Sequence, residues 1–325
     1  MRILFRVAAG PSIGFGHLMR ARALARALDV PPTVSIRGMA EAAAVASQRG
    51  FTVVPDGLSG LAGPASPDVL VIDDPLETEG ARWVRRGREA GIPVVTLHDL
   101  GLGYHESDLA IDGSIDPGDH RQDVTWAGPM FAVLDPQVAV VREHPVATRE
   151  GVLIALGGGE HVHRWGEALA RAVLLRCPDA RIRLVQGFAR EAGPAGDARI
   201  TWIQAPDGLA DELNRTAVAV LAGGLTLYEA AALATPAVAL AVVDAQQPTI
   251  RGFARRGAAI DAGHAADVAA FAHAADAAAE LLSHPGRAAR MGATAAHLID
   301  GRGVFRVADA IRQLATRDED HSHAA

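Results

Sequence analysis

The stretch VAVLAGGLTLYEAAALATPAVALAVVDAQQ, residues 218–247, contains the parts of one α/β unit. Residues 218–222 form an apolar run of strand length. Gly223 and Gly224 follow, and glycine lets the backbone turn tightly and approach a ligand closely. Thr226 is placed to cap a helix, and Thr235-Pro236 ends that helix before a second apolar run. The stretch therefore predicts strand, glycine turn, helix and strand.

Two interpretations of this stretch remain open on local pattern alone. A helix N-terminus behind a glycine turn presents free N–H groups and a positive dipole end to an anion. Glu229, near the start of the predicted helix, is placed to accept hydrogen bonds from sugar hydroxyls. The stretch is then a phosphate-and-ribose site, or it is an ordinary crossover with a glycine turn.

The same alternation of strand-length and helical patterns occupies most of the chain and predicts parallel sheets with right-handed crossovers. An irregular part near 113–150 separates two such series, and we place a linker near 136–150. Two α/β domains facing each other across a cleft would hold ligands at the carboxyl ends of both sheets. In the first series we expect strands at 2–9, 34–38, 51–55, 68–74, 92–99 and 108–112, with helices at 17–28, 40–49 and 78–90. In the second we expect strands at 151–156, 180–187, 198–204, 218–222 and 258–261, helices at 164–176, 207–215, 247–256, 266–282, 286–299 and 303–315, and a disordered tail at 316–325.

Composition excludes several functional classes. A chain of 325 residues with a net charge of −7 and no basic stripe is an unlikely nucleic-acid binder. All 31 basic residues are arginine, which excludes a P-loop lysine and a Schiff-base lysine. The single Cys177 excludes an internal disulfide and a multi-cysteine metal site. The apolar runs are too short for a signal sequence or a membrane span, so we expect a cytoplasmic protein.

Glycine turns open three of the predicted helices and suggest a diphosphate site. A dinucleotide site of the NAD type is disfavoured, because the first turn lacks the full GxGxxG pattern and a suitably spaced acidic residue. Three such turns across two domains fit a diphosphate in an interdomain cleft better. The glycines concerned are Gly14, Gly16, Gly157, Gly158, Gly223 and Gly224.

Four polar residues near the first sheet are candidates for chemistry. His17 begins the first helix, where the helix dipole disfavours imidazolium and favours a neutral base, although a loop hydrogen bond is the alternative role. Arg20 could bind phosphate or pair with a carboxylate. Asp73 and Asp74 end a strand, where they could orient a sugar, bind a metal, act as acid and base, or cap the next turn. Near the triple glycine, His161 and His163 with Glu160 have metal-like spacing without a defined third ligand, so we expect a solvated loop there.

Taken together, several segments resemble the PseG/SpsG-like family, whose type member hydrolyses a UDP-linked diacetamido-trideoxy sugar. They are IGFGHLMRARALARAL, HDLGLGYHESDLAID, AGPMFAVLDPQV, VLIALGGGE and AGGLTLYEAAALATPAVALAVVDAQQ, in order from about residue 6 to 262. The resemblance implies a GT-B fold. Residues 1–140 would form an N-terminal Rossmann-like domain with the catalytic histidine, 150–302 a C-terminal nucleotide-binding domain, and 303–325 a helix packing back toward the first domain plus the tail.

The resemblance also implies roles for individual residues. Gly223, Gly224 and Thr226 would hold the diphosphate, Glu229 the ribose, and Asp244 and Gln246 would lie near the sugar. His17 would activate water to cleave the anomeric C–O bond without a metal. The chain departs from the family pattern at Leu225, Tyr228, Ala245, Asp135 and Asp73-Asp74-Pro75, so the sugar is left open. The predicted site thus comprises His17, Asp73 and Asp74 as catalytic residues, and Gly14, Gly16, Arg20, Gly157, Gly158, Gly223, Gly224, Leu225, Thr226, Glu229, Asp244 and Gln246 as binding residues.

The function expected from these segments is hydrolysis of a nucleotide sugar, a UDP-sugar, in surface polysaccharide or nonulosonic-acid-type sugar biosynthesis. A GT-B glycosyltransferase using the same site on an acceptor is one alternative, and a non-catalytic nucleotide-sugar-binding relative is another. We expect no cofactor, no metal, no nucleic acid and no stable membrane insertion, and a monomer or weak homodimer.

Overall fold

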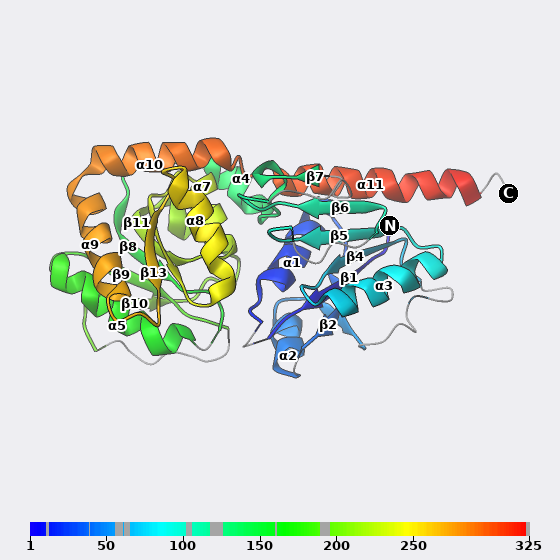
Figure 1. The fold of residues 1–325 in the computed structure, drawn as a ribbon, viewed down its shortest axis with the longest axis horizontal. Coiled ribbons are helices and arrows are strands. Elements are labelled where there is room, and N and C mark those ends of the chain that lie inside the picture. The colour runs from blue at the N-terminus through cyan, green and yellow to red at the C-terminus, as the bar shows by residue number, and fades with distance from the viewer. Residues whose placement is uncertain are drawn as a thin grey trace. The chain divides into compact units, whose positions relative to one another are not determined.

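Two compact units make up the chain. The computed structural model describes residues 1–10, 13–38, 40–55, 61, 66–101, 106–117, 126–159, 161–188 and 196–322. Unit 1 comprises Met1–Pro136 and Arg302–Ala325, and unit 2 comprises Gln137–Gly301. Each unit is built on one sheet of parallel strands with helices around it (Figure 1). The predicted fold class of two Rossmann-like parallel-sheet domains is confirmed.

The sheet of unit 1 has the strand order β3-β2-β1-β4-β5-β6-β7. Every residue of the central strands β1, β4 and β5 is buried. Parallel strands covered on both faces read as continuous apolar runs, and this is why the sequence shows VLVID and VVTLH without strict alternation. The strands are β1 Ile3–Ala8, β2 Thr33–Arg37, β3 Thr52–Val54, β4 Val69–Asp73, β5 Val94–His98, β6 Leu109–Asp112 and β7 Trp126–Ala127.

Helices α1, α2, α3 and α11 belong to unit 1. In α1, Leu18, Leu24 and Leu28 are buried along one face, and the helix ends at Asp29, whose φ of 56° is left-handed. Helix α11 packs against α1 and against the 3-10 turn η2. The helical elements of unit 1 are α1 Gly16–Leu28, α2 Ala40–Gln48, α3 Glu77–Glu89, η2 Pro129–Phe131 and α11 Gly303–Ser322.

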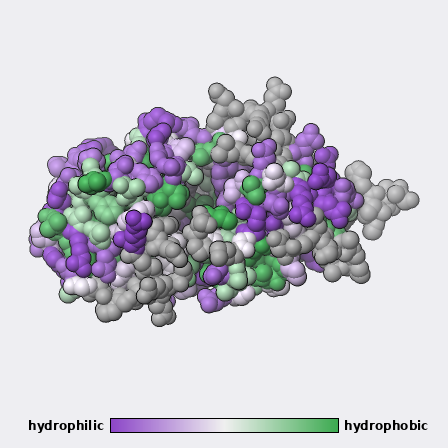
Figure 2. Space-filling view, turned by 60° about the horizontal axis from the view of Figure 1, so that its bottom comes forward, coloured by the Kyte–Doolittle hydropathy of each residue, from purple (hydrophilic) through white to green (hydrophobic). Residues whose placement is uncertain are grey.

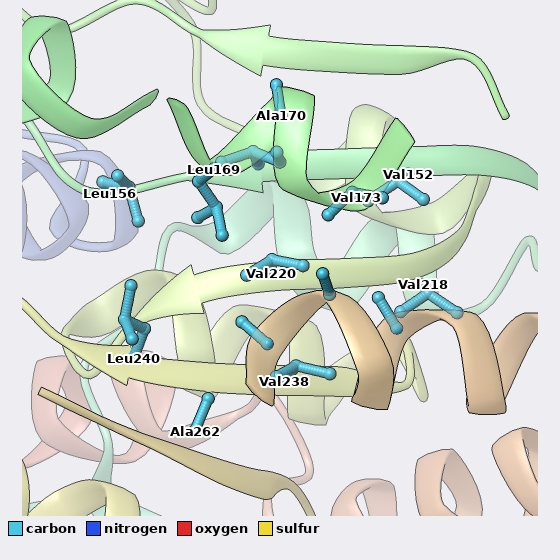
Figure 3. Close-up of a cluster of buried hydrophobic side chains, with 14 of the residues drawn as sticks. Val152, Leu156, Leu169, Ala170, Val173, Val218, Val220, Val238, Leu240 and Ala262 are labelled. Carbon is cyan, nitrogen blue, oxygen red and sulfur yellow. The ribbon is translucent and has the colours of Figure 1, made fainter. Parts of the chain in front are cut away.

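Unit 2 has the strand order β10-β9-β8-β11-β12-β13. Figure 3 shows side chains of its strands β8, β11 and β12 meeting side chains of α5 in one apolar layer, with Val152, Val218 and Leu240 among them. The strands are β8 Glu150–Ala155, β9 Ile182–Val185, β10 Ile200–Ile203, β11 Thr216–Ala222, β12 Ala237–Ala241 and β13 Ile260–His264. The helices are α4 Pro136–Arg142, α5 His161–Arg176, α6 Ala210–Asn214, α7 Leu225–Ala232, the 3-10 turn η3 Asp244–Gln246, α8 Gln247–Arg255, α9 Ala270–Ser283 and α10 Pro285–Leu298.

The strand orders place one topological switch point in each sheet. In unit 1 the chain leaves β1 toward β2 and leaves the adjacent β4 toward β5, in the opposite direction. In unit 2 the adjacent strands β8 and β11 diverge in the same way. Loops that leave neighbouring strands in opposite directions open a crevice at the carboxyl end of the sheet, which is where ligands bind in such folds.

Several element boundaries differ from those expected. Helix α4 and the short strand β7 lie in the part expected to be irregular, because a seven-residue helix and a two-residue strand carry too little periodicity to be recognised. Helix α11 runs to Ser322, so residues 316–322 are helical where a disordered tail was expected. That segment contains neither proline nor glycine, so no strong helix breaker ends a helix that is already packed upstream.

Figure 2 draws one face of the molecule, which is hydrophilic over much of its coloured part. Figure 2 shows purple side chains over most of the coloured surface of that face, with green apolar atoms in small patches. None of the helices in the described ranges is both long and apolar enough to cross a bilayer.

Candidate functional site

In unit 1 the switch point collects three of the predicted residues. His17 and Arg20 lie on the first turns of α1, which follows β1. Asp73 is the last residue of β4, the strand beside β1. Because the two strands are parallel and adjacent, their carboxyl ends bring the α1 residues and the aspartate together. We call His17, Arg20, Asp73 and Asp99 the His17 cluster.

Hydrogen bonds connect the His17 cluster directly. His17 Nδ1 lies 2.7 Å from Asp73 Oδ1. Arg20 donates from Nε to Asp73 Oδ2 at 2.7 Å and from Nη2 to Asp73 Oδ1 at 2.6 Å. The same guanidinium donates from Nη1 and Nη2 to the two carboxylate oxygens of Asp99, at 2.6 and 2.8 Å. One arginine thus binds two carboxylates, each through two hydrogen bonds.

The position of the His17 proton follows from a count of donors. Arg20 Nη2 also lies 2.8 Å from His17 Nδ1, but its two hydrogens are used by Asp73 and Asp99. Arg20 Nη2 therefore has no hydrogen left to donate to His17 Nδ1, and a guanidinium cannot accept one from it. Nδ1 therefore carries the proton and donates it to Asp73, an assignment made from the network. The Nε2 lone pair of neutral His17 is left available to accept a proton.

Electrostatics keep this arrangement ionised. Burial by itself raises the pKa of Asp73, but the charge of Arg20 and the hydrogen bonds from Arg20 and His17 outweigh it and hold that pKa well below its usual range. Partial desolvation beside Arg20 raises the pKa of the half-exposed Asp99, but the charge and hydrogen bonds of Arg20 outweigh that effect, so the pKa of Asp99 is lowered. Burial lowers the pKa of Arg20 while the two carboxylates raise it, and the net result lies well above the ordinary value. The aspartates are carboxylates and Arg20 is a cation at neutral pH.

Asp99 was not among the residues expected from the sequence. It directly follows β5, the neighbour of β4, so its position after a buried strand was a usable signal. Asp99 belongs to HDLGLGYHESDLAID, one of the segments that carry the family resemblance. Unlike Asp73, whose side chain is 3% exposed, the Asp99 side chain is 49% exposed.

Ligand-like atoms of His17, Asp73 and Asp99 lie within 4.8 Å of one another, a spacing that a metal site also has. However, the Arg20 guanidinium already binds both oxygens of both carboxylates. A divalent cation there would be repelled by the arginine and would have to displace its hydrogen bonds. The cluster is therefore an ion-pair network centred on Arg20.

Asp74 has a different environment from its neighbour. Arg37 donates to both of its oxygens, at 2.8 Å from Nε and 2.6 Å from Nη2. The backbone N–H of Leu76 donates to Asp74 Oδ1 at 3.0 Å, which is the turn-capping role left open by the sequence. With its side chain fully buried, Asp74 anchors the β4–α3 turn.

In unit 2 the switch point brings two glycine turns next to each other. The turn with Gly157 and Gly158 follows β8, and the turn with Gly223 and Gly224 follows the adjacent β11. Gly157 has a φ of 90°, a left-handed conformation that favours glycine. Gly158 accepts a hydrogen bond from the Phe188 N–H at 3.1 Å, so this turn also contacts the loop after β9.

Gly223 and Gly224 have different spatial constraints. A Cβ on Gly223 would stand 2.6 Å from Ile250 Cγ1 and 2.9 Å from Gln246 Cβ, so only glycine fits. A Cβ on Gly224 would meet only Gln246 Nε2, at 4.0 Å. Gln246 accepts the Val242 N–H through Oε1 at 2.9 Å, which directs its amide nitrogen toward the Gly224 backbone. The two glycines, Gln246 and the start of α7 are thus brought together.

The cap expected at Thr226 is wrong. Helix α7 begins at Leu225, so Gly224 is its N-cap, in an extended conformation with no side-chain cap hydrogen bond. The reason is that the chain leaves the glycine turn already oriented for the helix, and Thr226 falls inside the first turn. Leu225, Thr226 and Glu229 are all partly exposed on α7.

Other predicted binding residues lie as follows. Asp244 begins η3 with a 92% exposed side chain, and its Oδ1 accepts a hydrogen bond from Gln247 Nε2 at 2.9 Å. Gly14 closes a small turn with Gly10 through hydrogen bonds of 3.0 and 2.7 Å, and Gly16 is the first residue of α1. The solvated loop expected at His161 and His163 is wrong, because both belong to α5; Glu160 lies outside the described residues.

Among curated proteins, the chain is similar to the spore coat polysaccharide biosynthesis protein SpsG of Bacillus subtilis (strain 168). The two are 28% identical over 181 residues, which cover 50% of this chain and 52% of SpsG. The chain therefore matches about half the length of this relative. No family model matches the chain.

Several solved structures share the fold over nearly the whole chain. MurG of Acinetobacter baumannii is 15% identical with a TM-score of 0.61, covering 96% of this chain and 100% of its own. MnaA of S. aureus, in a co-structure with UDP, is 13% identical with a TM-score of 0.61 and 96% coverage of both chains. The spinosyn rhamnosyltransferase SpnG, complexed with thymidine diphosphate, is 18% identical with a TM-score of 0.61, covering 97% of this chain and 100% of its own.

Proposed function

We propose that this chain, an SpsG-like protein with the GT-B fold, is an enzyme that acts on a nucleotide sugar. The similarity to SpsG and the shared GT-B architecture confirm the family resemblance expected from the sequence. The observation that carries the proposal is the pair of His17 and Asp73. A buried carboxylate that accepts the Nδ1 hydrogen fixes the tautomer in which Nε2 is a base.

Unit 2 is proposed to bind the nucleoside diphosphate. Adjacent glycine turns at a switch point let a backbone approach phosphate oxygens, and the uncapped start of α7 offers N–H groups with the positive end of a helix dipole. Gln246 adds an amide donor beside Gly224. Glu229, near the start of α7, is proposed to bind ribose hydroxyls. Structures of the same fold with UDP and with thymidine diphosphate support a diphosphate ligand.

For the reaction we propose hydrolysis with His17 as general base. Nε2 of His17 takes a proton from water as the water oxygen bonds to the anomeric carbon. The anomeric C–O bond breaks, its electron pair stays on the diphosphate oxygen, and UDP leaves. Asp73 stabilises the imidazolium that forms, and that proton then passes to solvent. The products are a free sugar and UDP.

Transfer to an acceptor is the second candidate, because the same base could take the proton of an acceptor hydroxyl. The glycosyltransferases among the similar structures favour this alternative. A non-catalytic binder is the third, motivated by Ala245 and by Asp73-Asp74-Pro75, where the chain departs from the family pattern. The polysaccharide biosynthesis role in the name of SpsG leads us to propose a cytoplasmic role in surface polysaccharide or nonulosonic-acid-type sugar synthesis.

The test is UDP release from a panel of UDP-sugars, with EDTA present and with or without acceptor sugars. Free sugar formed without acceptor supports hydrolysis, and turnover only with acceptor supports transfer. His17→Gln should lower turnover by about 100-fold or more while UDP affinity, measured by calorimetry, stays within about twofold. His273→Gln, at an exposed position of α9, is the matched control and should change neither. If UDP does not bind at millimolar concentration, the nucleotide assignment is wrong; if it binds without turnover, the binder alternative holds.

A further inference from the structure

The His17 cluster has an unbalanced charge. Asp73 and Asp99 are carboxylates, and Arg20 is the cation that hydrogen-bonds them within the described part of the chain; a His17 side chain that is ready to act as a base carries no charge. The net charge of these groups is therefore negative. Asp73 is buried beneath Arg20, whereas Asp99 has a half-exposed side chain, so the uncompensated charge faces solvent at Asp99.

The turn that carries Asp99 is held in a costly conformation. Leu100 has a φ of 57°, in the left-handed region that residues other than glycine, asparagine and aspartate rarely adopt. Two buried residues near the end of β6 hold it: Ser114 Oγ accepts the Leu100 N–H at 2.8 Å, and Asp112 Oδ2 accepts the Gly101 N–H at 2.6 Å. Asp112 also accepts the Ser114 N–H through Oδ1 at 2.9 Å. Strain that is held by buried partners tends to occur at functional positions.

Arg20 does not need Asp99 for neutralisation. Asp73 alone supplies one full negative charge and accepts from Nε and Nη2. The second carboxylate therefore adds a charge that the ion pair does not require, at a place where part of it remains open to solvent. That combination suits contact with a ligand.

We infer that Asp99 is a specificity-determining residue, which selects neutral or amine-bearing sugars and disfavours acidic ones. The inference rests on the proposed function and names the sugar class of that same site. A base acts only within hydrogen-bond reach, so the sugar whose anomeric carbon is attacked lies beside the His17 cluster. Its hydroxyl or ammonium groups can donate to Asp99, while a carboxylate on the sugar is repelled by it. Two like charges about 5 Å apart at a partly exposed site give a discrimination of about tenfold.

The experiment is calorimetry of the full chain with UDP, UDP-glucose, UDP-glucosamine and UDP-glucuronate, repeated with Asp99→Asn. For the wild type we expect UDP-glucuronate to bind about tenfold more weakly than UDP-glucose, and UDP-glucosamine at least as tightly as UDP-glucose. Asp99→Asn should bring UDP-glucuronate within about twofold of UDP-glucose and leave the affinity for UDP unchanged. Glu106→Gln removes an equal charge from an exposed residue paired with Arg88 and is the matched control.

The outcomes separate this inference from the proposed function. If UDP binds and the ratio of the two sugar affinities does not change in Asp99→Asn, the role of Asp99 is overturned and the proposed function stands. If Glu106→Gln changes the ratio of the two affinities as much as Asp99→Asn does, the role of Asp99 is also overturned, because the effect then comes from the net charge of the protein and not from a contact with Asp99. If neither UDP nor any UDP-sugar binds, the proposed function fails and this inference fails with it. A merely structural role for Asp99 would weaken all three sugars alike and leave the ratio constant.

Discussion

Asp73 accepts three of the hydrogen bonds in the His17 cluster, so its ionisation should couple to stability. The pKa of Asp73 in the folded protein lies below the unfolded value near 3.9. Ionised Asp73 therefore stabilises the folded state fully above about pH 3.9, and this stabilisation is lost as the pH falls toward and through the folded pKa. Asp73→Asn leaves Arg20 short of a partner and should destabilise the protein by about 3 kcal/mol at pH 7. The measurement is urea unfolding of both proteins between pH 7 and pH 3, and the difference between them should shrink below about pH 4.

Asp276→Asn provides the control for this prediction. Asp276 pairs with Arg176 on the surface of unit 2, with both side chains well exposed, so its loss should cost less than about 1 kcal/mol at any pH. A difference between wild type and Asp73→Asn that stays constant down to pH 3 would contradict the ion-pair account.

Among single residues, the sequence identified those that chemistry alone makes conspicuous. His17 after a glycine loop and Asp73 at a strand end were both expected, and the structure places them 2.7 Å apart. Asp73 and Asp74 looked equivalent in the sequence, but Asp73 ends β4 and meets Arg20, whereas Asp74 lies in the turn that follows and meets Arg37. Asp99 was missed because only the pairing of β4 with β5 brings its turn to Arg20.

Among the elements, the β11–α7 turn offers a matched pair of glycine variants. Gly223→Ala forces a methyl group into Ile250 and Gln246, so we expect a loss of about 2 kcal/mol of stability together with loss of UDP binding. Gly224→Ala has room in the protein and an ordinary φ of −108°, so stability should fall by less than about 0.5 kcal/mol. If the backbone at Gly224 contacts diphosphate, as proposed, the added methyl group should still weaken UDP binding by about tenfold or more.

Thermal unfolding and calorimetry with UDP separate these two effects. Normal UDP affinity in a stable Gly224→Ala protein would contradict the placement of the diphosphate at this turn. Normal stability in Gly223→Ala would instead show that α8 shifts to accommodate the methyl group.

The end of α7 offers a stabilising substitution. Ala234 has a φ of 53° in the turn between α7 and β12. Alanine is strained there and glycine is not, so Ala234→Gly should stabilise the protein by about 1 kcal/mol. Ala230→Gly, in the interior of α7, should destabilise it by about 1 kcal/mol and serves as the control for adding a glycine. A lower melting temperature for Ala234→Gly would contradict the strain account.

At the scale of the whole molecule, α11 belongs to unit 1 although it follows unit 2 in the chain. Val304, Val307 and Ile311 are fully buried where α11 packs against α1 and η2, and Arg312 donates to the Ala27 carbonyl at 2.7 Å. Removing residues 302–325 should cost about 5 kcal/mol of unit 1 stability, since three buried aliphatic side chains lose their packing. That loss is comparable to the net stability of a domain.

Fragments check this prediction. Residues 137–301 form unit 2 without interruption and contain its complete sheet, so this fragment should fold alone with a cooperative thermal transition by circular dichroism. Residues 1–136 lack α11 and should remain unfolded or form aggregates. Cooperative unfolding of the 1–136 fragment would show that unit 1 does not depend on α11.

The sequence by itself determined the alternation of strands and helices, the parallel sheets and the glycine turns. These features depend on local periodicity and on backbone freedom, which neighbouring residues set. It also singled out His17, Arg20 and Asp73, because polar residues next to buried strands are visible in a one-dimensional pattern. The GT-B fold followed from collinear segments without knowledge of any contact.

Only the tertiary structure decided which strands are neighbours, and with them the membership of the site. The strand orders place β4 between β1 and β5 and place β8 beside β11, so loops up to about 80 residues apart in sequence share one edge of a sheet. The Nδ1 proton of His17, the second carboxylate at Asp99 and the return of α11 to unit 1 all depend on such long-range pairings. Local pattern carries no information about them, because the free energy that selects a pairing comes from packing between distant segments.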